Sequence, residues 1–144
     1  MNTLNFLKIV GAALKVIGAV SAAYFSQMIG GVDGLFITLM TMIVLDYFTG
    51  VLVAIIKKKL SSEVGYKGLA KKLGILVAVA VGNQIGCIMN MDSLRGLVIG
   101  FYIANEGISI LENLCRAGTP VPKYLIIVLK QLQEQENKDA EQEK

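Results

Sequence analysis

Four long apolar stretches dominate the sequence, and their length restricts the folds that are open to the chain. They cover about residues 9–30, 34–56, 73–91 and 94–113. A bilayer core about 30 Å thick is crossed by roughly 20 apolar residues in a helix, so each stretch is long enough to span it. No run alternates apolar and polar residues with a period of two, which argues against strands. We therefore expect an all-α membrane protein with four transmembrane helices.

The composition supports a membrane protein and argues against several functional classes. Hydrophobic residues make up 54% of the 144 residues and charged residues 17%, whereas globular domains carry about a quarter charged residues. The net charge of +3 is too small to indicate nucleic-acid binding. There is no histidine, and Cys87 and Cys115 show no metal-ligand spacing. The sequence also lacks a nucleophile–base pair and a phosphate-binding loop, so we expect no enzyme activity, cofactor or metal.

The first apolar stretch, about residues 9–30, allows three interpretations. Lys8 and Lys15 are seven residues apart and share one helix face, which is an amphipathic pattern. Such a helix can span the membrane with Lys15 reaching to the near surface, or it can lie in the interface. The small residues of "AVSAA" also suit the cleavage site of a signal peptide. We expect the stretch to span, and three spans plus an interfacial N-terminal helix are the alternative.

Residues 57–72, between the second and third stretches, are strongly basic. Six lysines stand here against one glutamate, and the positive-inside rule places such a loop in the cytoplasm. If the first stretch spans, both termini are cytoplasmic as well. The lysines assigned to this cytoplasmic basic loop are Lys57, Lys58, Lys59, Lys67, Lys71 and Lys72.

The region after the fourth stretch is too short to span again. Gly118, Pro120 and Pro122 end the helix, and the apolar run that follows has only about six residues. We expect a short interfacial helix over about residues 123–133. Residues 134–144 form a charged, solvated tail, so residues 1–133 make up a single helical membrane domain.

Small residues recur every four positions in several of the expected helices. Lipid supplies no hydrophobic drive for helix association, so close approach depends on such residues. They pack either the helices of one chain or the helices of two copies of the chain, and the spacing alone leaves both open. The candidate packing residues are Gly18, Ala22, Gly50, Gly74, Ala78, Gly82, Gly86, Gly96, Gly100 and Ala104.

Two carboxylates, Asp46 and Glu106, lie deep inside apolar stretches. An ionised acid at mid-bilayer costs about 3 kcal/mol, so these residues are expected to have partners. Counted from the cytoplasmic ends of their stretches, Asp46 and Asn83 lie at the same depth of about 15 Å, which predicts a polar layer across three helices. The candidate polar residues are Asp46, Thr49, Asn83, Gln84, Asn105, Glu106, Ser109 and Asn113.

Three interpretations of this polar layer stay open. It is a buried hydrogen-bonded knot with protonated carboxyls, a surface that lines water in an oligomer, or a proton-coupled transport site. Burial raises the pKa of a carboxyl in the first and third cases.

Residues 45–82 and 101–125 resemble the holin family of phage lysis and toxin secretion. The resemblance covers about residues 34–130 and consists of motifs in a fixed order. These motifs are Asp46, Thr49 and Gly50 in one helix; Ser61, Ser62 and Gly65 after the lysines; Asn105, Glu106, Ser109, Glu112 and Asn113 in a later helix; and Gly118, Pro120 and Pro122.

The resemblance implies a small multi-pass protein of the bacterial cytoplasmic membrane that forms homo-oligomers. Holins associate and open lesions through which an endolysin, or in toxin loci a secreted toxin, escapes. The partners implied are the lipid bilayer, further copies of the chain, and functionally the endolysin or toxin of a bacteriophage, prophage or toxin locus. Two other classes remain: a small proton-coupled exporter or ion channel that uses Asp46 and Glu106, and an antiholin that restrains a separate holin.

Overall fold

Four long helices make up most of the chain, and no strand occurs in the part that the structure describes. The structure is a computed structural model that describes residues 2–59, 61–128 and 130–131. Each of the four helices is long and apolar enough to cross a membrane, as expected. The helices are α1 (Thr3–Met28), α2 (Gly34–Ile56), α3 (Ser62–Met89) and α4 (Ser93–Arg116).

A short helix follows α4, as the sequence predicts. Residues 123–128 and 130–131 are helical, and the side chains of Tyr124, Leu125 and Ile127 are exposed. The tail expected at residues 134–144 lies outside the described residues.

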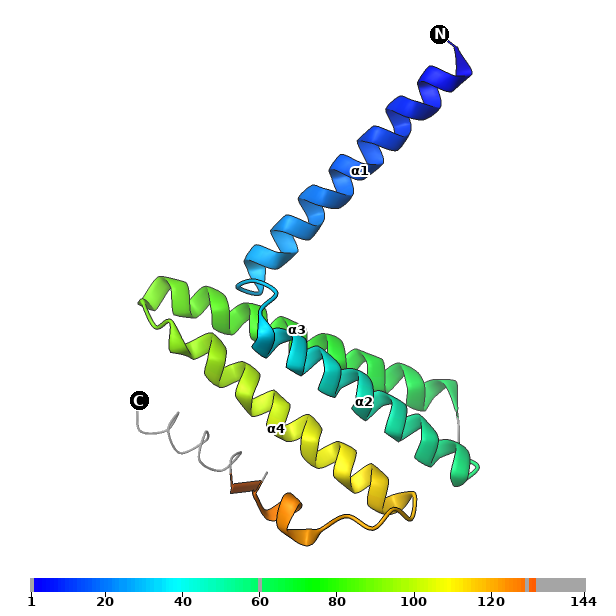
Figure 1. The fold of residues 1–144 in the computed structure, drawn as a ribbon, viewed down its shortest axis with the longest axis vertical. Helices are drawn as coiled ribbons and strands as arrows, with labels where there is room; N and C mark the ends of the chain where they lie inside the picture. The colour runs from blue at the N-terminus through cyan, green and yellow to red at the C-terminus, as the bar shows by residue number, and fades with distance from the viewer. Residues whose placement is uncertain (1, 60, 129, 132–144) are drawn as a thin grey trace.

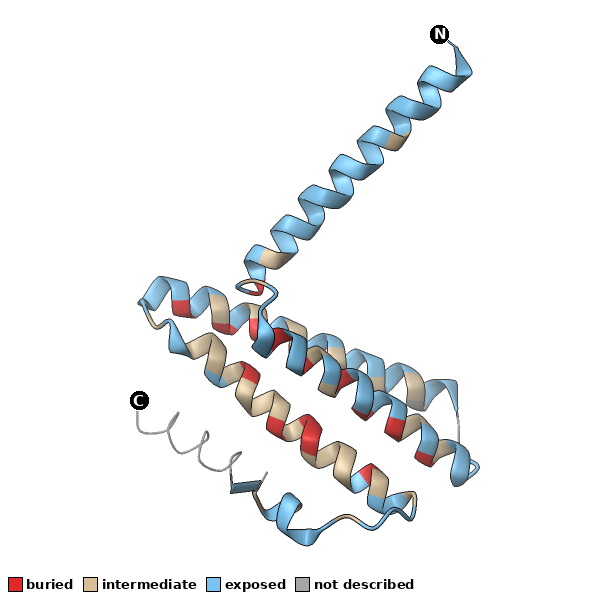
Figure 2. Ribbon diagram, viewed as in Figure 1, coloured by how far each residue is buried: buried red, intermediate tan, exposed pale blue. Residues whose placement is uncertain are grey.

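Helices α2, α3 and α4 form a three-helix bundle from which α1 projects (Figure 1). Helix α4 packs against both neighbours, whereas α2 and α3 touch each other sparsely. Buried residues lie on the inner faces of the bundle, and α1 carries none (Figure 2). The apolar core consists of Ile29, Phe36, Leu39, Ile43, Ile75, Val79 and Ile99.

The inner face of α2 explains how a polar residue enters the bundle. Its buried positions include Leu39, Ile43, Asp46, Thr49 and Val53, which recur every three to four residues and therefore share one face of a helix. Asp46 thus occupies a position that the periodicity of α2 directs into the core. Many large apolar side chains on the other faces of α2, such as Val44 and Phe48, are exposed in the single chain, which suits contact with lipid.

Helix α3 begins at Ser62, well before the predicted start of the third span near residue 73. The prediction that residues 57–72 form a loop is therefore wrong for Lys67, Lys71 and Lys72, which are helical. Hydropathy marks where the apolar segment begins, but the helix extends beyond that segment into the basic residues before it. An ion pair of 2.6 Å between the Lys67 ammonium and the Glu63 carboxylate supports this first part of α3.

Small residues allow α3 and α4 to approach closely. Gly82 and Gly86 are buried. A Cβ atom at Gly82 would lie 2.8 Å from Cγ2 of Val98, and one at Gly86 would lie 2.8 Å from the carbonyl oxygen of Met91. Ala104 is also buried, with 4% of its surface exposed. These three candidate packing residues therefore pack the bundle of one chain.

The remaining candidate packing residues are less tightly packed within the chain. Added Cβ atoms at Gly18, Gly74 and Gly96 would meet nothing within 4 Å, and Ala22 is exposed. Ala78 and Gly100 are half-buried, and a Cβ atom at Gly50 would lie at an ordinary 3.6 Å from the amide nitrogen of Asn113.

The turn between α1 and α2 is held by the guanidinium of Arg95 from α4. Its Nε donates to the carbonyl of Ile29 at 2.5 Å, its Nη2 donates to the carbonyl of Gly31 at 2.9 Å, and its Nη1 lies 2.6 Å from Oδ2 of Asp33. Gly30 has a φ of +77°, and a Cβ there would collide with Asn83 and Arg95. We call Asp33, Arg95 and this turn the turn clasp. It fixes the end of α1 to the bundle.

The α3–α4 contact generates a first prediction. Gly82→Ala places a methyl group against the β-branched Val98, which has little rotamer freedom, so the helices must separate. We expect the free energy of unfolding to be about 1–3 kcal/mol lower than that of Gly74→Ala. Gly74→Ala is the control, because it gains the same helix propensity but its added methyl group meets no neighbouring atom. Thermal unfolding followed by circular dichroism in lipid nanodiscs measures it. Adding Val98→Ala should restore the midpoint, and equal midpoints for Gly82→Ala and Gly74→Ala would contradict the packing.

The turn clasp predicts a pH dependence in acid. Hydrogen bonding from Arg95, together with that from the Phe36 N–H, holds the pKa of Asp33 below its usual value near 3.8. Because the folded-state pKa is lowered, the contribution of Asp33 to stability is complete above about pH 3.8 and disappears as the pH falls through the lowered value. The unfolding midpoint of the native chain should therefore fall toward that of Asp33→Asn below pH 3.8. A constant difference between the two chains across that range would rule out this ion pair as the cause.

Candidate functional site

Lys72 places its ammonium between the two carboxylates that the sequence left without a cation. Its Nζ lies 2.6 Å from Oδ2 of Asp46 on α2 and also contacts Oε2 of Glu106 on α4. Only 13% of the Lys72 side chain, 12% of Asp46 and 4% of Glu106 are exposed. One charged side chain from each helix of the bundle therefore meets its partners away from the surface.

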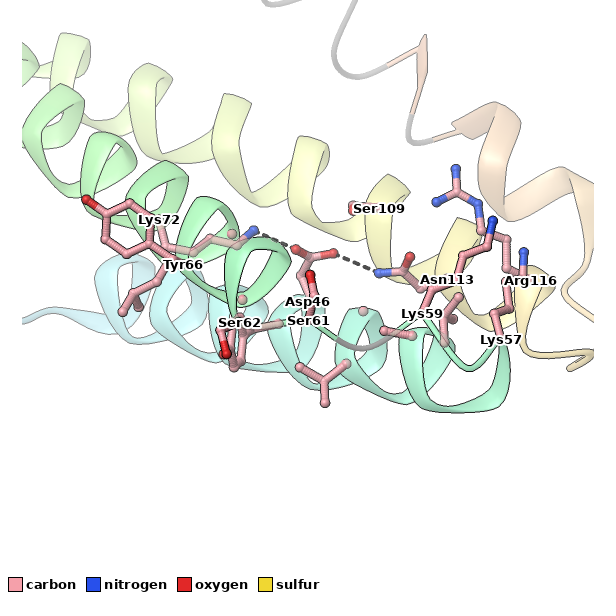
Figure 3. A pocket seen from close by; sticks show the side chains of 18 residues that line it. Asp46, Lys57, Lys59, Ser61, Ser62, Tyr66, Lys72, Ser109, Asn113 and Arg116 are labelled. Atoms are coloured by element: carbon pink, nitrogen blue, oxygen red, sulfur yellow. Dashed lines mark hydrogen bonds and ion pairs between the residues drawn. The ribbon is translucent and has the colours of Figure 1, made fainter.

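Two neutral side chains complete this group. Asn113 on α4 donates from Nδ2 to Oδ1 of Asp46 at 3.2 Å and to Oγ1 of Thr49 at 3.3 Å. The Thr49 hydroxyl donates to the backbone carbonyl of Asp46 at 3.0 Å. Figure 3 shows Asp46 between Lys72 and Asn113, so each of its carboxylate oxygens has a donor. We call Asp46, Thr49, Lys72, Glu106 and Asn113 the ion cluster.

The three charged residues lie at the same depth along the bundle. Asp46 is ten residues before Ile56, the last residue of α2, and Glu106 is ten residues before Arg116, the last residue of α4. Lys72 is ten residues after Ser62, the first residue of α3. All three helix ends are at the same side of the bundle (Figure 1), so each charge is about 15 Å from it.

The balance of charge restricts the chemistry of the ion cluster. One ammonium neutralises one carboxylate, so the cluster carries a single negative charge when both acids are ionised and is neutral when they share a proton. Charges withdrawn from water are tolerated when they are paired and their remaining hydrogen-bonding groups are satisfied. Removing Lys72 would leave two uncompensated acids inside the bundle. The arrangement therefore acts as an ionic tie between three helices.

The candidate polar residues do not all meet in one place in the structure. Asp46, Thr49, Glu106 and Asn113 meet in the ion cluster. Ser109 lines a cavity beside it, and Asn105 is half-buried on α4.

Asn83 and Gln84 do not join this layer, so the depth match between Asn83 and Asp46 is wrong. Instead they donate to the backbone carbonyl of Met28 at the end of α1, at 3.0 and 3.4 Å. The error follows from the start of α3: measured from Ser62, Asn83 lies far deeper than Asp46 does from Ile56.

Lys72 is the functional residue that the sequence analysis missed, because it was assigned to the basic loop. The signal that would have found it is the start of α3. Two serines, Ser61 and Ser62, stand directly before Glu63, a pattern typical of the first turn of a helix. A helix beginning there carries Lys72 to the depth of Asp46. Of the three interpretations of the polar layer, a buried knot fits the contacts within one chain, with an ammonium as the central partner.

The sequence pattern of the bacteriophage holin family matches residues 23–134 of the chain. The chain belongs to this family. The match covers α2, α3 and α4 completely and therefore includes the whole ion cluster. With its four apolar helices, this holin-family chain is a multi-pass membrane protein.

Several bacterial and phage proteins are similar to the chain. An uncharacterized protein of Listeria monocytogenes is 46% identical over 104 residues, which cover 72% of this chain and 74% of the relative. An uncharacterized protein of Clostridium perfringens is 40% identical over 115 residues, covering 78% and 85%. A probable holin of Bacillus phage phi105 is 37% identical over 83 residues, covering 57% and 62%. No solved structure matches the chain.

The ion cluster predicts a large difference between two lysines of α3. Lys72→Met leaves two buried carboxylates without their cation, and we expect it to cost about 3–5 kcal/mol. Lys67→Met is the matched control: its ion pair with Glu63 is more than 70% exposed, so the loss should stay below about 1 kcal/mol. Thermal unfolding in nanodiscs measures both.

A third variant separates charge from shape at the same site. Adding Glu106→Gln to Lys72→Met removes one of the two uncompensated acids, so it should recover part of the lost stability. Identical unfolding midpoints for Lys72→Met and Lys67→Met would show that the ion cluster does not hold the bundle together.

Proposed function

We propose that the chain oligomerises in the bacterial cytoplasmic membrane and opens lesions that release an endolysin or a secreted toxin, causing lysis of the host cell. Its place in the holin family supports this function. So does the ion cluster, which conceals ionisable groups inside a bundle that otherwise presents an apolar surface to lipid. A chain built in this way can accumulate in a membrane without making the membrane leaky.

Lesion opening requires that concealed polar groups become exposed to water. In the single chain, Lys72 satisfies Asp46 and Glu106 internally. At high density the same ionic groups can pair between neighbouring chains, and their helices can then line water. The small residues that stay unpacked in one chain, such as Gly18 on α1 and Gly74 on α3, offer surfaces for close contact between copies.

The distribution of charge supports an orientation with the basic end of the bundle in the cytoplasm. Lys57, Lys59 and Arg116 lie at the end where α2 and α4 finish, whereas the turn clasp lies at the opposite end. The positive-inside rule assigns the first end to the cytoplasm. The short helix at residues 123–128 follows α4 and therefore belongs to that side in this orientation, and the start of α1 reaches it if α1 spans.

The contacts of the ion cluster argue against a proton-coupled exporter or ion channel that uses Asp46 and Glu106. A transport site needs a carboxylate that is open to its cargo, but Lys72 occupies both acids. An antiholin would share this fold, and only a functional assay separates it from a holin.

The experiment expresses the chain from an inducible promoter in bacteria, with and without a cytoplasmic endolysin that has no export signal of its own. We expect abrupt loss of turbidity and release of a cytoplasmic reporter enzyme when both are present, and cell death without wall breakdown when the endolysin is absent. Lys72→Met should change the time of onset at equal membrane content, and Lys67→Met should leave it unchanged.

Other results point to the other classes. Viable cells that retain the endolysin despite abundant chain in the membrane would refute lesion formation. Saturable, proton-driven transport of a cationic dye without loss of viability would indicate an exporter. Delayed lysis on co-expression with an unrelated holin would indicate an antiholin.

A further inference from the structure

A cavity of about 900 Å³ lies between the last turns of α2 and the first turns of α3, next to the ion cluster (Figure 3). Val51 and Ala54 of α2 and Leu69 of α3 give it apolar walls. Gly65 and Gly68 widen it on the α3 side, where Gly65 faces the hydroxyl of Tyr47 and Gly68 faces its ring. The sparse contact between α2 and α3 is the reason that this space exists.

The lining of the cavity carries more positive charge than the ion pairs of the structure neutralise. Four basic side chains line it, against Asp46 as the acid among its described lining residues. Lys72 is held in the ion cluster, and Arg116 lies 3.4 Å from Glu112 on the surface of α4. Lys57 and Lys59 take part in none of the ion pairs found among the described residues. These two ammonium groups are available to an anion.

We propose that this cavity binds an anionic phospholipid, with the phosphate of its headgroup at Lys57 and Lys59 and its glycerol and upper acyl chains along the apolar walls. Basic pockets between transmembrane helices at the inner surface suit such headgroups. The phosphate supplies the negative charge that the lining lacks. The apolar walls supply a surface that lipid chains cover better than water does.

The shape and position of the cavity favour a lipid over a soluble phosphate ion. A volume of about 900 Å³ is of the size that accommodates a drug-sized molecule, far more than one phosphate needs. The cavity also begins where α2 ends at Ile56, the level at which lipid headgroups meet the end of a spanning helix. An inner-leaflet lipid reaches it by lateral movement without leaving the membrane.

This inference does not rest on lysis. Only the assignment to the inner leaflet depends on the proposed orientation. A binding measurement on the purified chain therefore tests the cavity whether or not the chain opens lesions.

The test titrates the purified full-length chain in detergent with phosphatidylglycerol, or with phosphatidylcholine of the same acyl chains, and counts bound lipids by native mass spectrometry. We expect binding of phosphatidylglycerol to be about tenfold tighter. The double variant K57Q/K59Q should remove this preference and leave binding of phosphatidylcholine unchanged. K58Q/K71Q is the matched control: it removes the same charge from lysines that do not line the cavity, and it should keep the preference.

A further variant and a competitor separate the remaining explanations. Gly68→Leu fills the apolar part of the cavity without changing charge, so it should weaken binding of both lipids. Inorganic phosphate in excess should leave phosphatidylglycerol bound. If K57Q/K59Q and K58Q/K71Q lost the preference for phosphatidylglycerol to the same extent, diffuse attraction to the charged surface would explain the preference, and the proposal would be overturned. Displacement of the lipid by inorganic phosphate, or equal affinity for the two lipids, would overturn it as well.

Discussion

One ammonium between two carboxylates holds three helices at a common depth, and the rest of the bundle depends on this contact. Helix α4 packs closely on both of its neighbours, but α2 and α3 touch sparsely. Lys72 joins α3 to α2 through Asp46 and to α4 through Glu106, so it links the two helices that packing alone leaves apart. Between this link and the C-terminal end of α2, a cavity lies between α2 and α3.

The surrounding lipid favours assembly of all three helices of the bundle together. Each charged side chain would cost about 3 kcal/mol at the centre of a bilayer if its helix stood alone. The cost falls for all three helices only when they assemble, because each charge finds its partner on another helix. The apolar core at Leu39, Val79 and Ile99 then lies at the other half of the same bundle. The ion cluster therefore holds one half of the bundle, while apolar packing and the turn clasp hold the other half, where small residues such as Gly82 allow the helices to approach closely.

The sequence predicts the existence of the helices better than their limits. Apolar length finds all four helices because the thickness of a bilayer sets that length. It places the start of α3 too late because hydropathy falls at Lys71 and Lys72, although the helix continues through them to Ser62. Asp46 and Glu106 stand out as charges in apolar runs, whereas Lys72 is hidden among neighbours of the same charge. The direction of α1 is beyond a sequence argument, because its fixed contacts lie only at its end, where Asn83 and Arg95 bind backbone carbonyls.

The lysines of residues 57–72 show that position along a helix, and not charge alone, decides what a basic residue does. Lys67 is exposed and pairs with a neighbour one turn away, so its contribution to stability is small. Lys72, five residues later, has only 13% of its side chain exposed and is engaged by two acids. A charge neutralised inside the bundle contributes little to the attraction between a basic segment and the cytoplasmic side of the membrane. In the proposed orientation, the lysines that attract the inner surface of the membrane are therefore those outside the ion cluster. Lys57 and Lys59 belong to this set and also line the cavity, so the proposed lipid site uses charges that the bundle leaves unpaired among its described residues.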